Sequence, residues 1–255
     1  MSDMENKVVL ITGAAGGIGT ATALAFARRG AALALSDLDE TSERAKDLCR
    51  QLSALGSRYV FLSADVSNPD QTDRMIRDAA GAFGRLDMAF NNAGINGRTE
   101  SPLLDRFPFE TWEKVIGVNL TGVFNCLKTE LQIMEPTGGG AIVNTASIAS
   151  YVDCLANSAY TASKHGVAGL TKHVASNYGT RGFRCNAVAP GIIDTPMSSL
   201  TRGNSEIAQQ QLAANPQGKF GTPEEVAGAV VWLCSSEASF VNGHLLTIDG
   251  GYTIR

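Results

Sequence analysis

The sequence predicts an α/β fold, a single doubly wound Rossmann-type domain in which helices cover both faces of a seven-stranded parallel sheet. Short β-branched or aliphatic runs alternate with longer segments of helical period along the chain. Parallel strands need crossover connections, and the helical segments supply them. Neither a linker nor an internal repeat interrupts the alternation, so residues 1–255 are assigned to one domain.

The first strand and helix are the most clearly defined elements. The apolar run at 7–12 leads through a glycine cluster into residues 17–29, where Ile18, Ala21 and Leu24 follow a helical period. Further strands are predicted at 32–36, 58–63, 86–90, 141–145, 184–189 and 245–248, and further helices at 40–55, 68–83, 109–134, 158–178 and 223–235. Ligands of such sheets bind beyond the carboxyl ends of the strands, so the residues that follow each strand are the site candidates.

The composition argues against several classes of protein. The chain has 255 residues, of which 44% are hydrophobic and 18% charged, and can bury a core without disulfides or structural metal. Its 21 basic and 25 acidic side chains are scattered, so neither a nucleic acid nor an anionic membrane is an expected partner. The start resembles no signal or transit peptide, and no apolar stretch approaches the roughly 18–20 residues of a membrane-spanning helix. A soluble, cytoplasmic protein is predicted.

Cysteine and histidine spacing gives no sign of a metal site. The five cysteines contain no C-x-x-C pair, which favours small apolar side chains in a reduced protein over a disulfide framework or zinc site. They are Cys49, Cys126, Cys154, Cys185 and Cys234. The three histidines lack ligand-like spacing and receive no role; they are His165, His173 and His244. No metal is expected.

A glycine loop follows the first predicted strand. The stretch reads Thr12-Gly-Ala-Ala-Gly-Gly-Ile-Gly19. Glycines allow a sharp turn and a close approach of backbone amides to a pyrophosphate, and the start of the next helix adds partial positive charge. The spacing differs from the G-x-G-x-x-G fingerprint, so a turn without a ligand stays open as an alternative.

Asp37 closes the second strand, 18 residues after Gly19. An acidic residue at this distance accepts hydrogen bonds from the adenosine ribose hydroxyls and repels a 2′-phosphate. No lysine or arginine stands at Gly16 or Leu38 to bind that phosphate. The sequence therefore predicts NAD(H) over NADP(H), with a solvated turn acid as the alternative for Asp37.

Tyr160 and Lys164 lie four residues apart on one predicted helix, and therefore on one face. A tyrosine hydroxyl is a poor base at its ordinary pKa of about 10, but a neighbouring ammonium favours the phenolate. Ser147 ends the fifth strand, where its hydroxyl can bond a substrate oxygen. These residues form a candidate catalytic group, and a surface pairing of Tyr160 with Lys164 is the alternative.

The arrangement resembles the short-chain dehydrogenase/reductase family over about residues 7–252. The motifs that carry the resemblance are Thr12-Gly-x-x-x-Gly-Ile-Gly19, Asp65-Val66, Asn91-Asn-Ala-Gly94, Asn119, Ser147, Tyr160-x-x-x-Lys164 and Pro190-Gly191. The resemblance implies that Tyr160 is the general acid/base and that Ser147 orients the substrate oxygen. It implies that Lys164 binds the nicotinamide ribose, and that Asn119 bends its helix and holds a water that relays protons.

The resemblance also implies the cofactor contacts. Asp65 is similar to the residue that recognises adenine, Val66 supplies a backbone contact, and Ile193 and Thr195 resemble the pair that fixes the carboxamide. The full expected set is Gly13, Gly16, Gly17, Ile18, Gly19, Asp37, Leu38, Asp65, Val66, Asn92, Ala93, Gly94, Tyr160, Lys164, Pro190, Gly191, Ile193 and Thr195. Two mild departures from the family pattern are Gly16, where many members have serine or a basic residue, and Cys185, in place of a β-branched residue.

The expected substrate is a secondary alcohol or ketone of modest size, held over the nicotinamide. Candidate lining residues are Asn96, Ile148, Tyr151, Cys154, Leu155, Asn157, Ile192 and Met197, each of which can instead serve packing. Residues 192–218 include a polar stretch in the position of the family's substrate lid. The role of Cys154 stays open.

The predicted function is an NAD(H)-dependent alcohol oxidoreductase, and several other interpretations stay open. One is a 3-oxoacyl thioester reductase of the same family, and another is a catalytically silent NAD-sensing regulator. An epimerase or dehydratase of the extended branch shares the Tyr-x-x-x-Lys pair, but those chains are usually longer. The family is commonly a homotetramer, and small residues in 158–178, Gly166 and Gly169 among them, permit close helix approach, so a tetramer of D2 symmetry is expected.

Overall fold

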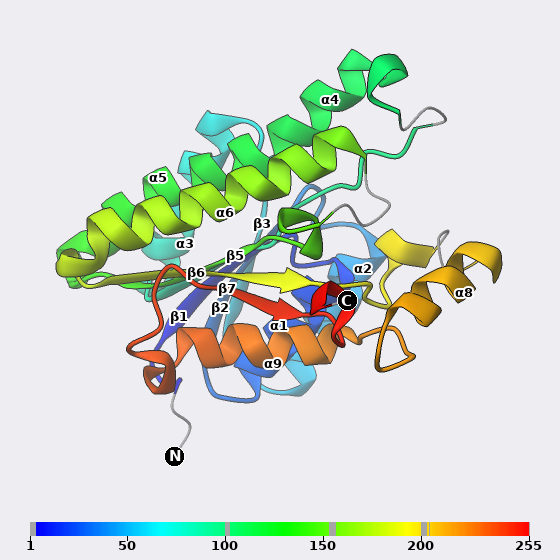
Figure 1. Cartoon of the computed structure of the whole chain (residues 1–255). Helices are drawn as coiled ribbons and strands as arrows, with labels where there is room; N and C mark the ends of the chain where they lie inside the picture. Colours follow the sequence, from blue (N-terminus) through cyan, green and yellow to red (C-terminus); the bar gives the residue numbers. More distant parts are fainter. Residues whose placement is uncertain (1–3, 100–102, 153–156, 200–202, 204, 255) are drawn as a thin grey trace.

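The computed structural model describes residues 4–99, 103–152, 157–199, 203 and 205–254. These residues form a parallel sheet of seven strands in the order β3-β2-β1-β4-β5-β6-β7 (Figure 1). The strands are β1 (Val8–Thr12), β2 (Ala32–Asp37), β3 (Tyr59–Ser63), β4 (Met88–Asn91), β5 (Gly140–Thr145), β6 (Phe183–Pro190) and β7 (Leu245–Ile248). The predicted number and parallel arrangement of the strands are confirmed. The order reverses between β1 and β4, which is where ligands of such sheets bind.

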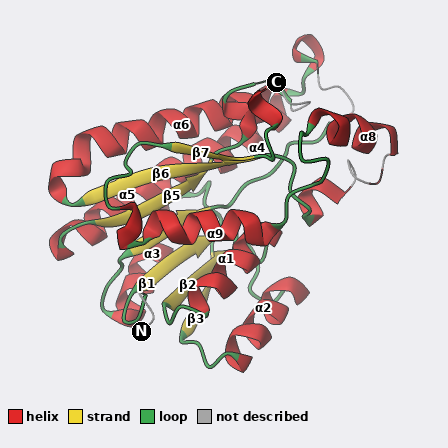
Figure 2. Cartoon of the chain, turned by 60° about the horizontal axis from the view of Figure 1, so that its bottom comes forward, coloured by secondary structure: helices red, strands yellow, loops and turns green. Residues whose placement is uncertain are grey.

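Helices cover both faces of this sheet, as predicted (Figure 2). On one face lie α1 (Gly17–Ala27), α2 (Glu43–Ala54) and α9 (Pro223–Cys234), whose buried side chains share a core with Val9 and Ile11 of β1. On the other lie α3 (Pro69–Phe83), α5 (Gly122–Met134) and α6 (Ser158–Tyr178), which share a core with Leu10. Successive strand residues therefore point to opposite faces, and both faces are apolar because both are covered.

Side-chain caps set two helix starts that the sequence pattern places three residues and one residue too early. The helix predicted at 40–55 begins after Ser42, whose hydroxyl accepts a hydrogen bond from the Ala45 amide. The helix predicted at 68–83 begins after Asn68, whose side chain accepts from the amides of Asp70 and Gln71. The amides of the first helical turn have no partner within the helix. A cap side chain accepts hydrogen bonds from them, and it thereby fixes the residue at which the helix begins.

The helix predicted at 109–134 is interrupted in the structure. It consists of α4 (Phe109–Ile116), a π-helical segment (Gly117–Thr121) and α5. Asn119 lies in the π-helical segment and is fully buried. Such bulges are frequent at functional sites, and the Asn119 side chain here bonds the backbone of Ile95, in the segment after β4.

The polar stretch after β6 contains a helix that the sequence pattern does not predict, α8 (Ser205–Ala214). Few of its described side chains are buried, Ala208 and Gln211 among them, so it shows no strong apolar stripe. The short turns Ile148–Ser150 and Pro196–Ser198 also lie at the carboxyl edge of the sheet. None of the helices in the described ranges is long and apolar enough to cross a membrane.

Candidate active site

The ends of β1 and β4 are joined by side-chain hydrogen bonds. Thr12 Oγ1 accepts from the amides of Asn92 and Ala93, at 3.0 and 3.1 Å. Asn92 Nδ2 donates to the carbonyls of Thr12 and Gly13, at 3.2 and 3.1 Å. The start of the glycine loop and the segment leading to Gly94 therefore form one rigid edge, at the point where the strand order reverses.

The glycine loop needs its glycines for steric reasons. Gly13 has a φ of +62°, a region that favours glycine, and a Cβ on Gly19 would lie 2.2 Å from the Gly13 carbonyl oxygen. Gly16 is the N-cap of α1 and offers no side chain to its first-turn amides. The amides of Gly17, Ile18 and Gly19 therefore start the helix without intrahelical partners, an arrangement that binds anions.

Asp37 lies at the end of β2 and faces this loop. Its two carboxylate oxygens accept hydrogen bonds from the amides of Ala15 and Leu38, each at 2.9 Å. A carboxylate oxygen has more than one lone pair, so Asp37 keeps capacity for further donors. The side chain of Leu38 is 68% exposed and leaves the approach to Asp37 without a cationic group at that position.

Asp65 and Val66 follow β3. Asp65 Oδ1 accepts from the amide and hydroxyl of Ser67, at 2.9 and 2.7 Å. Val66 is buried, and its carbonyl accepts from Asn125 Nδ2 at 2.9 Å. The structure thus gives both residues a local structural role in addition to the cofactor contacts expected of them.

Tyr160 and Lys164 lie on α6 beside the end of β5, and Ser147 follows that strand. Lys164 is 3% exposed, its Nζ donates to the Thr145 carbonyl at 2.7 Å, and the same atom lies 5.5 Å from the centre of the Tyr160 ring. Burial lowers the pKa of Lys164 to about 8, because an ammonium loses its hydration there. Ser147 is also buried, and its hydroxyl accepts from the Ala149 amide at 3.1 Å.

Asn119 connects this group to the segment after β4. Its side chain accepts from the Ile95 amide at 2.8 Å and donates to the Ile95 carbonyl at 2.9 Å. It also donates to Ser163 Oγ at 3.3 Å, and Ser163 in turn donates to the Tyr160 carbonyl at 2.7 Å. A Cβ on Gly94 would lie 3.3 Å from Asn119 Oδ1 and 3.8 Å from Lys164 Nζ, so the backbone of Gly94 runs close to both.

The segment after β6 lies against the end of β7 and against the glycine loop. Gly191 follows Pro190, and a Cβ on it would lie 2.9 Å from the Cα of Asp249. Ile193 is buried and paired with Gly221. Thr195 faces the glycine loop, because a Cβ on Gly17 would lie 2.8 Å from Thr195 Cγ2. The structure therefore brings the expected pyrophosphate and carboxamide segments together across one edge of the sheet.

Among the candidate lining residues, Asn157 and Tyr151 make hydrogen bonds that hold the backbone. Asn157 caps α6 by accepting from the Tyr160 amide at 2.9 Å, and it donates to the carbonyls of Asn96 and Gly97 at 2.6 and 3.0 Å. The Tyr151 hydroxyl donates to the Leu245 carbonyl at 3.0 Å. Ile148 is buried, while Ile192 is partly and Met197 substantially exposed. Cys154 and Leu155 lie outside the described residues.

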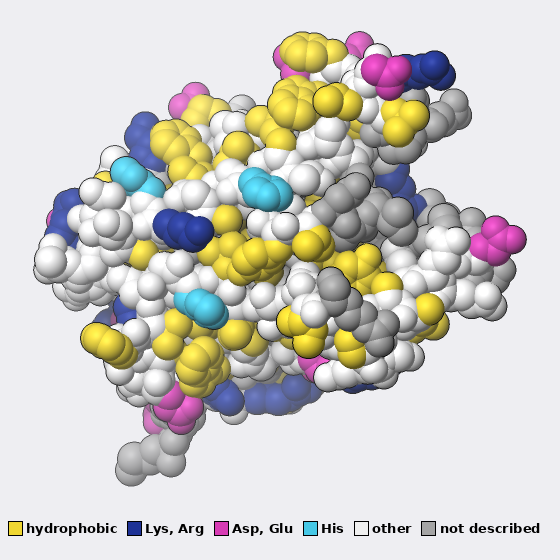
Figure 3. All heavy atoms as spheres, viewed as in Figure 1, with side chains coloured by type: hydrophobic (Ala, Val, Ile, Leu, Met, Phe, Trp, Pro, Cys, Tyr) yellow, Lys and Arg dark blue, Asp and Glu magenta, His cyan; other side chains and the backbone are white. Residues whose placement is uncertain are grey.

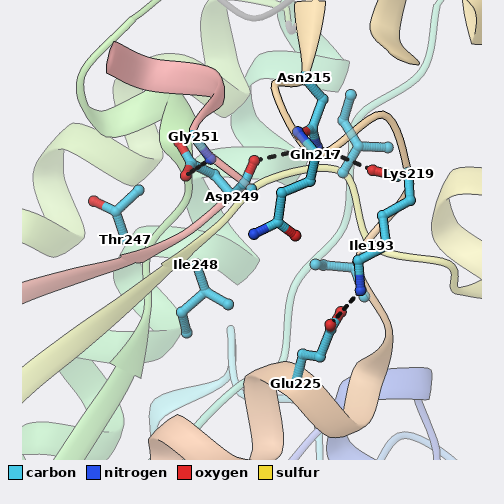
Figure 4. Close-up of a pocket in the computed structure, with 12 residues that line it drawn as sticks. Ile193, Asn215, Gln217, Lys219, Glu225, Thr247, Ile248, Asp249 and Gly251 are labelled. Atoms are coloured by element: carbon cyan, nitrogen blue, oxygen red, sulfur yellow. Dashed lines mark hydrogen bonds and ion pairs between the residues drawn. The ribbon is translucent and has the colours of Figure 1, made fainter.

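A cavity of about 350 Å³ lies at the base of the predicted lid (Figure 4). Its wall combines the end of β7, around Asp249, with Asn215, Gln217 and Lys219 of the chain that returns from α8. Asn215 Nδ2 donates to the carbonyls of Lys219 and Asp249, at 3.0 and 3.3 Å. The lining contains none of the four expected catalytic residues, so this cavity is separate from the catalytic group.

Two residues near the candidate catalytic residues were not predicted from the sequence. They are Arg98 and Ser163. Arg98 donates to the Met197 carbonyl at 2.9 Å, and so links the segment after β4 to the segment after β6. One signal for it exists in the sequence, since Arg98 is the only basic residue between Arg85 and Arg106. Nothing in the sequence distinguishes Ser163 from other serines.

Comparisons with known proteins identify the family. Residues 13–253 match the model of a family described as enoyl-(acyl carrier protein) reductase. The chain is 41% identical over 252 residues to cyclohexanol dehydrogenase of Acinetobacter sp. (strain SE19), covering 98% of this chain and 96% of that protein.

Solved structures agree with this match. The crystal structure of levodione reductase superposes with a TM-score of 0.93 at 37% identity, covering 98% of this chain and 99% of that one. A structure described as an Agrobacterium tumefaciens 2-deoxy-D-gluconate 3-dehydrogenase with bound NADP has a TM-score of 0.90 at 32% identity, covering 99% and 98%. The chain belongs to the short-chain dehydrogenase/reductase family. It is an oxidoreductase of this class, which uses a nicotinamide cofactor.

Proposed function

We propose that the protein is an NAD(H)-dependent oxidoreductase that interconverts a secondary alcohol and its ketone. The observation that carries this proposal is the placement of buried Lys164 beside Tyr160, with Ser147 at the end of the adjoining strand. A lysine is seldom buried without a purpose, because removing the ammonium from water is costly. Here its position suits a group that holds a neighbouring hydroxyl ready for proton transfer.

The residues present fit a dinucleotide. A pyrophosphate needs a close backbone approach and free amides, and the loop from Gly13 to Gly19 offers both, since a Cβ at either position would collide with backbone atoms. A nicotinamide ribose needs partners for its hydroxyl groups, and Lys164 Nζ lies close to the backbone of Gly94, in the segment after β4. When bound, the nicotinamide ring accepts or supplies the hydride.

In the proposed mechanism, the Tyr160 hydroxyl exchanges a proton with the substrate oxygen, and the Ser147 hydroxyl donates a hydrogen bond to that same oxygen. Lys164 stabilises the Tyr160 phenolate as an ammonium and donates to the cofactor ribose. Asn119 holds the Ile95 backbone and positions a water for proton exchange with solvent. The proposal keeps Asn119, Ser147, Tyr160 and Lys164 as the catalytic set.

NAD(H) is proposed over NADP(H) because of Asp37. Its carboxylate stands at the end of β2, and the neighbouring Leu38 brings no positive charge to offset it. The NADP described in the Agrobacterium tumefaciens structure belongs to that protein. The test is a comparison of kcat/KM for the two cofactors, and a preference for NADP(H) would overturn this part of the proposal.

A ring alcohol or ring ketone of modest size is the proposed substrate. Cyclohexanol and levodione name the substrates of two similar proteins, and they support trying cyclic secondary alcohols and ketones first. The experiment is a panel of such compounds with the purified protein, followed by NADH absorbance. Turnover of 3-oxoacyl thioesters alone would favour the alternative reductase, and redox-neutral turnover would favour an epimerase. A complete lack of turnover would favour a silent sensor.

The proposal also includes a D2 homotetramer and a cytoplasmic location. It further includes one domain over residues 1–255 and a substrate lid at 192–218. A groove of about 450 Å³ runs between α5 and α6, lined by Phe124, Leu131 and Leu170 together with Lys128 and Arg181. On the same face, apolar side chains lie exposed among basic ones (Figure 3). An exposed apolar face of this kind supports pairing with a second copy of the chain.

A further inference from the structure

Arg98 is an exposed residue whose guanidinium joins the segment after β4 to the segment after β6, and these two segments are expected to bound the substrate. The residues before Arg98 are fixed by Asn119, which holds Ile95, and by Asn157, which holds the carbonyls of Asn96 and Gly97. The guanidinium of Arg98 reaches the Met197 carbonyl in the segment after β6, two residues after Thr195. Arg98 is therefore tied on one side to the start of the helix that carries Tyr160 and on the other to the proposed lid.

The amide side chains around Arg98 are already engaged in holding the structure. Asn157 uses both ends of its amide, on the Tyr160 amide and on the carbonyls of Asn96 and Gly97. Asn119 uses both ends of its amide on Ile95. Asn96 Nδ2 also lies 3.4 Å from the Met197 carbonyl. These groups have little hydrogen-bonding capacity left for a substrate.

Arg98 has donors to spare. A guanidinium carries five N–H groups, and the bond to Met197 uses one of them on a neutral carbonyl. Within the described residues, Arg98 forms no ion pair with a carboxylate. Asp194 is the other charged residue in the described parts of the segments expected to surround the substrate. These described parts are 94–99, 147–152, 157–160 and 191–199. The Asp194 amide bonds the Gly221 carbonyl at the base of the lid.

We propose that Arg98 selects secondary alcohols that carry a carboxylate at the end remote from the hydroxyl group. The guanidinium gives up the Met197 carbonyl and takes the carboxylate in a two-point, charge-assisted pair, which is stronger and more directional than the bond it replaces. The hydroxyl group of the same molecule then faces Tyr160 and Ser147. This inference rests on the proposed function, because it assigns a substrate class to the same site.

The kinetic test compares cyclohexanol with cis-4-hydroxycyclohexanecarboxylate, which shares the ring and adds the anion. For the wild-type protein with NAD⁺, we expect kcat/KM for the hydroxy acid to exceed that for cyclohexanol at least tenfold. Arg98→Gln is expected to reduce this ratio at least tenfold, mainly by raising KM for the hydroxy acid, and Arg98→Lys to reduce it less. The control is Arg106→Gln, which removes an exposed arginine paired with Asp105 and leaves the ratio unchanged.

A binding experiment separates failure of this inference from failure of the proposed function. Cyclohexanecarboxylate and the neutral cyclohexanecarboxamide are titrated into the protein with NAD⁺ and followed by calorimetry, which requires no turnover. Weaker binding of the carboxylate alone in Arg98→Gln supports the inference even if neither alcohol is oxidised. The inference would be overturned if Arg98→Gln weakened binding of the carboxylate and the carboxamide equally, or changed neither. It would also be overturned if the substitution affected both alcohols equally. Each of these outcomes would count against the inference even if cyclohexanol is a good substrate.

Discussion

The carboxyl group of Glu130 accepts a hydrogen bond from Asn91 Nδ2 at 3.1 Å, in the core between α5 and β4. Asn91 Nδ2 also donates to Asn144 Oδ1 at 3.0 Å, and both Glu130 and Asn144 are fully buried. Within the described residues, Glu130 Oε1 and Asn91 Oδ1 lack partners. Burial raises the pKa of Glu130 to about 7, so the side chain is a carboxylic acid with a proton to donate over much of the acidic range.

We expect Glu130 to make the protein less stable as the pH rises from about 4.5 to about 7. The unfolded chain releases this proton near 4.5, whereas the folded chain keeps it until about 7, so the stabilising contribution is complete below 4.5 and lost above 7. The loss is on the order of 3 kcal/mol. Urea unfolding between pH 4.5 and 8 measures it against Glu130→Gln, which keeps a buried amide of similar shape. A constant stability difference between the two proteins would contradict the expectation.

Replacing Tyr160 with phenylalanine is expected to abolish most turnover while leaving NADH binding nearly intact. The substitution removes the hydroxyl that exchanges the proton, a contribution worth about 10²- to 10⁴-fold in rate. Steady-state kinetics and NADH fluorescence measure the two effects. Tyr178→Phe, at the far end of the same helix, is the matched control. Full activity of Tyr160→Phe would refute the catalytic assignment.

Lys164→Met is expected to differ from Tyr160→Phe, because it should weaken NADH binding and turnover together. Lys164 is proposed to donate to the cofactor ribose and also to stabilise the phenolate, and methionine preserves only the apolar part of its side chain. Comparison of the NADH dissociation constants of the two variants checks this. Unchanged NADH affinity in Lys164→Met would remove the ribose contact from the proposal.

Asp37→Asn is expected to shift the ratio of kcat/KM for NAD over NADP by at least about tenfold toward NADP. The substitution removes the negative charge that opposes a 2′-phosphate, and charge-assisted bonds are roughly twice as strong as neutral ones. Asp39→Asn is the control, since Asp39 is exposed and its carboxylate accepts from the amide and hydroxyl of the nearby Thr41. An unchanged ratio in Asp37→Asn would mean that another part of the site selects the cofactor.

The parts of the site that could be predicted from sequence depend on local geometry. Tyr160 and Lys164 share a helix face because they are four residues apart, and Asp37 reaches the glycine loop because both follow neighbouring parallel strands. The alternation of strands and helices was sufficient for the sheet. The first residue of a helix was less predictable where a cap side chain, such as that of Ser42, fixes it.

The parts that could not be predicted are contacts between distant segments. Arg98 meets Met197 across 99 residues, and Glu130 meets Asn91 across 39, so neither pairing leaves a local pattern. Gly166 shows a related difficulty. Its small size suits packing between subunits, but a Cβ there would lie 2.7 Å from Leu120 Cδ1 of the same chain, so this glycine is needed within the subunit. Gly169 has no such neighbour within 4 Å.

This difference makes Gly169 the position at which to test the proposed tetramer. Gly169 is an exposed residue of α6, and Gly81 is a comparable helical position on α3 with open space around it. Leucine favours a helix over glycine by about 0.8–1 kcal/mol, so neither Gly169→Leu nor Gly81→Leu should destabilise the folded subunit. We expect light scattering to give a tetramer for the wild type and for Gly81→Leu, and a smaller species for Gly169→Leu, because the added side chain blocks close approach of a second α6. A monomeric wild type would overturn the tetramer, and a tetrameric Gly169→Leu would place the interface away from this part of α6.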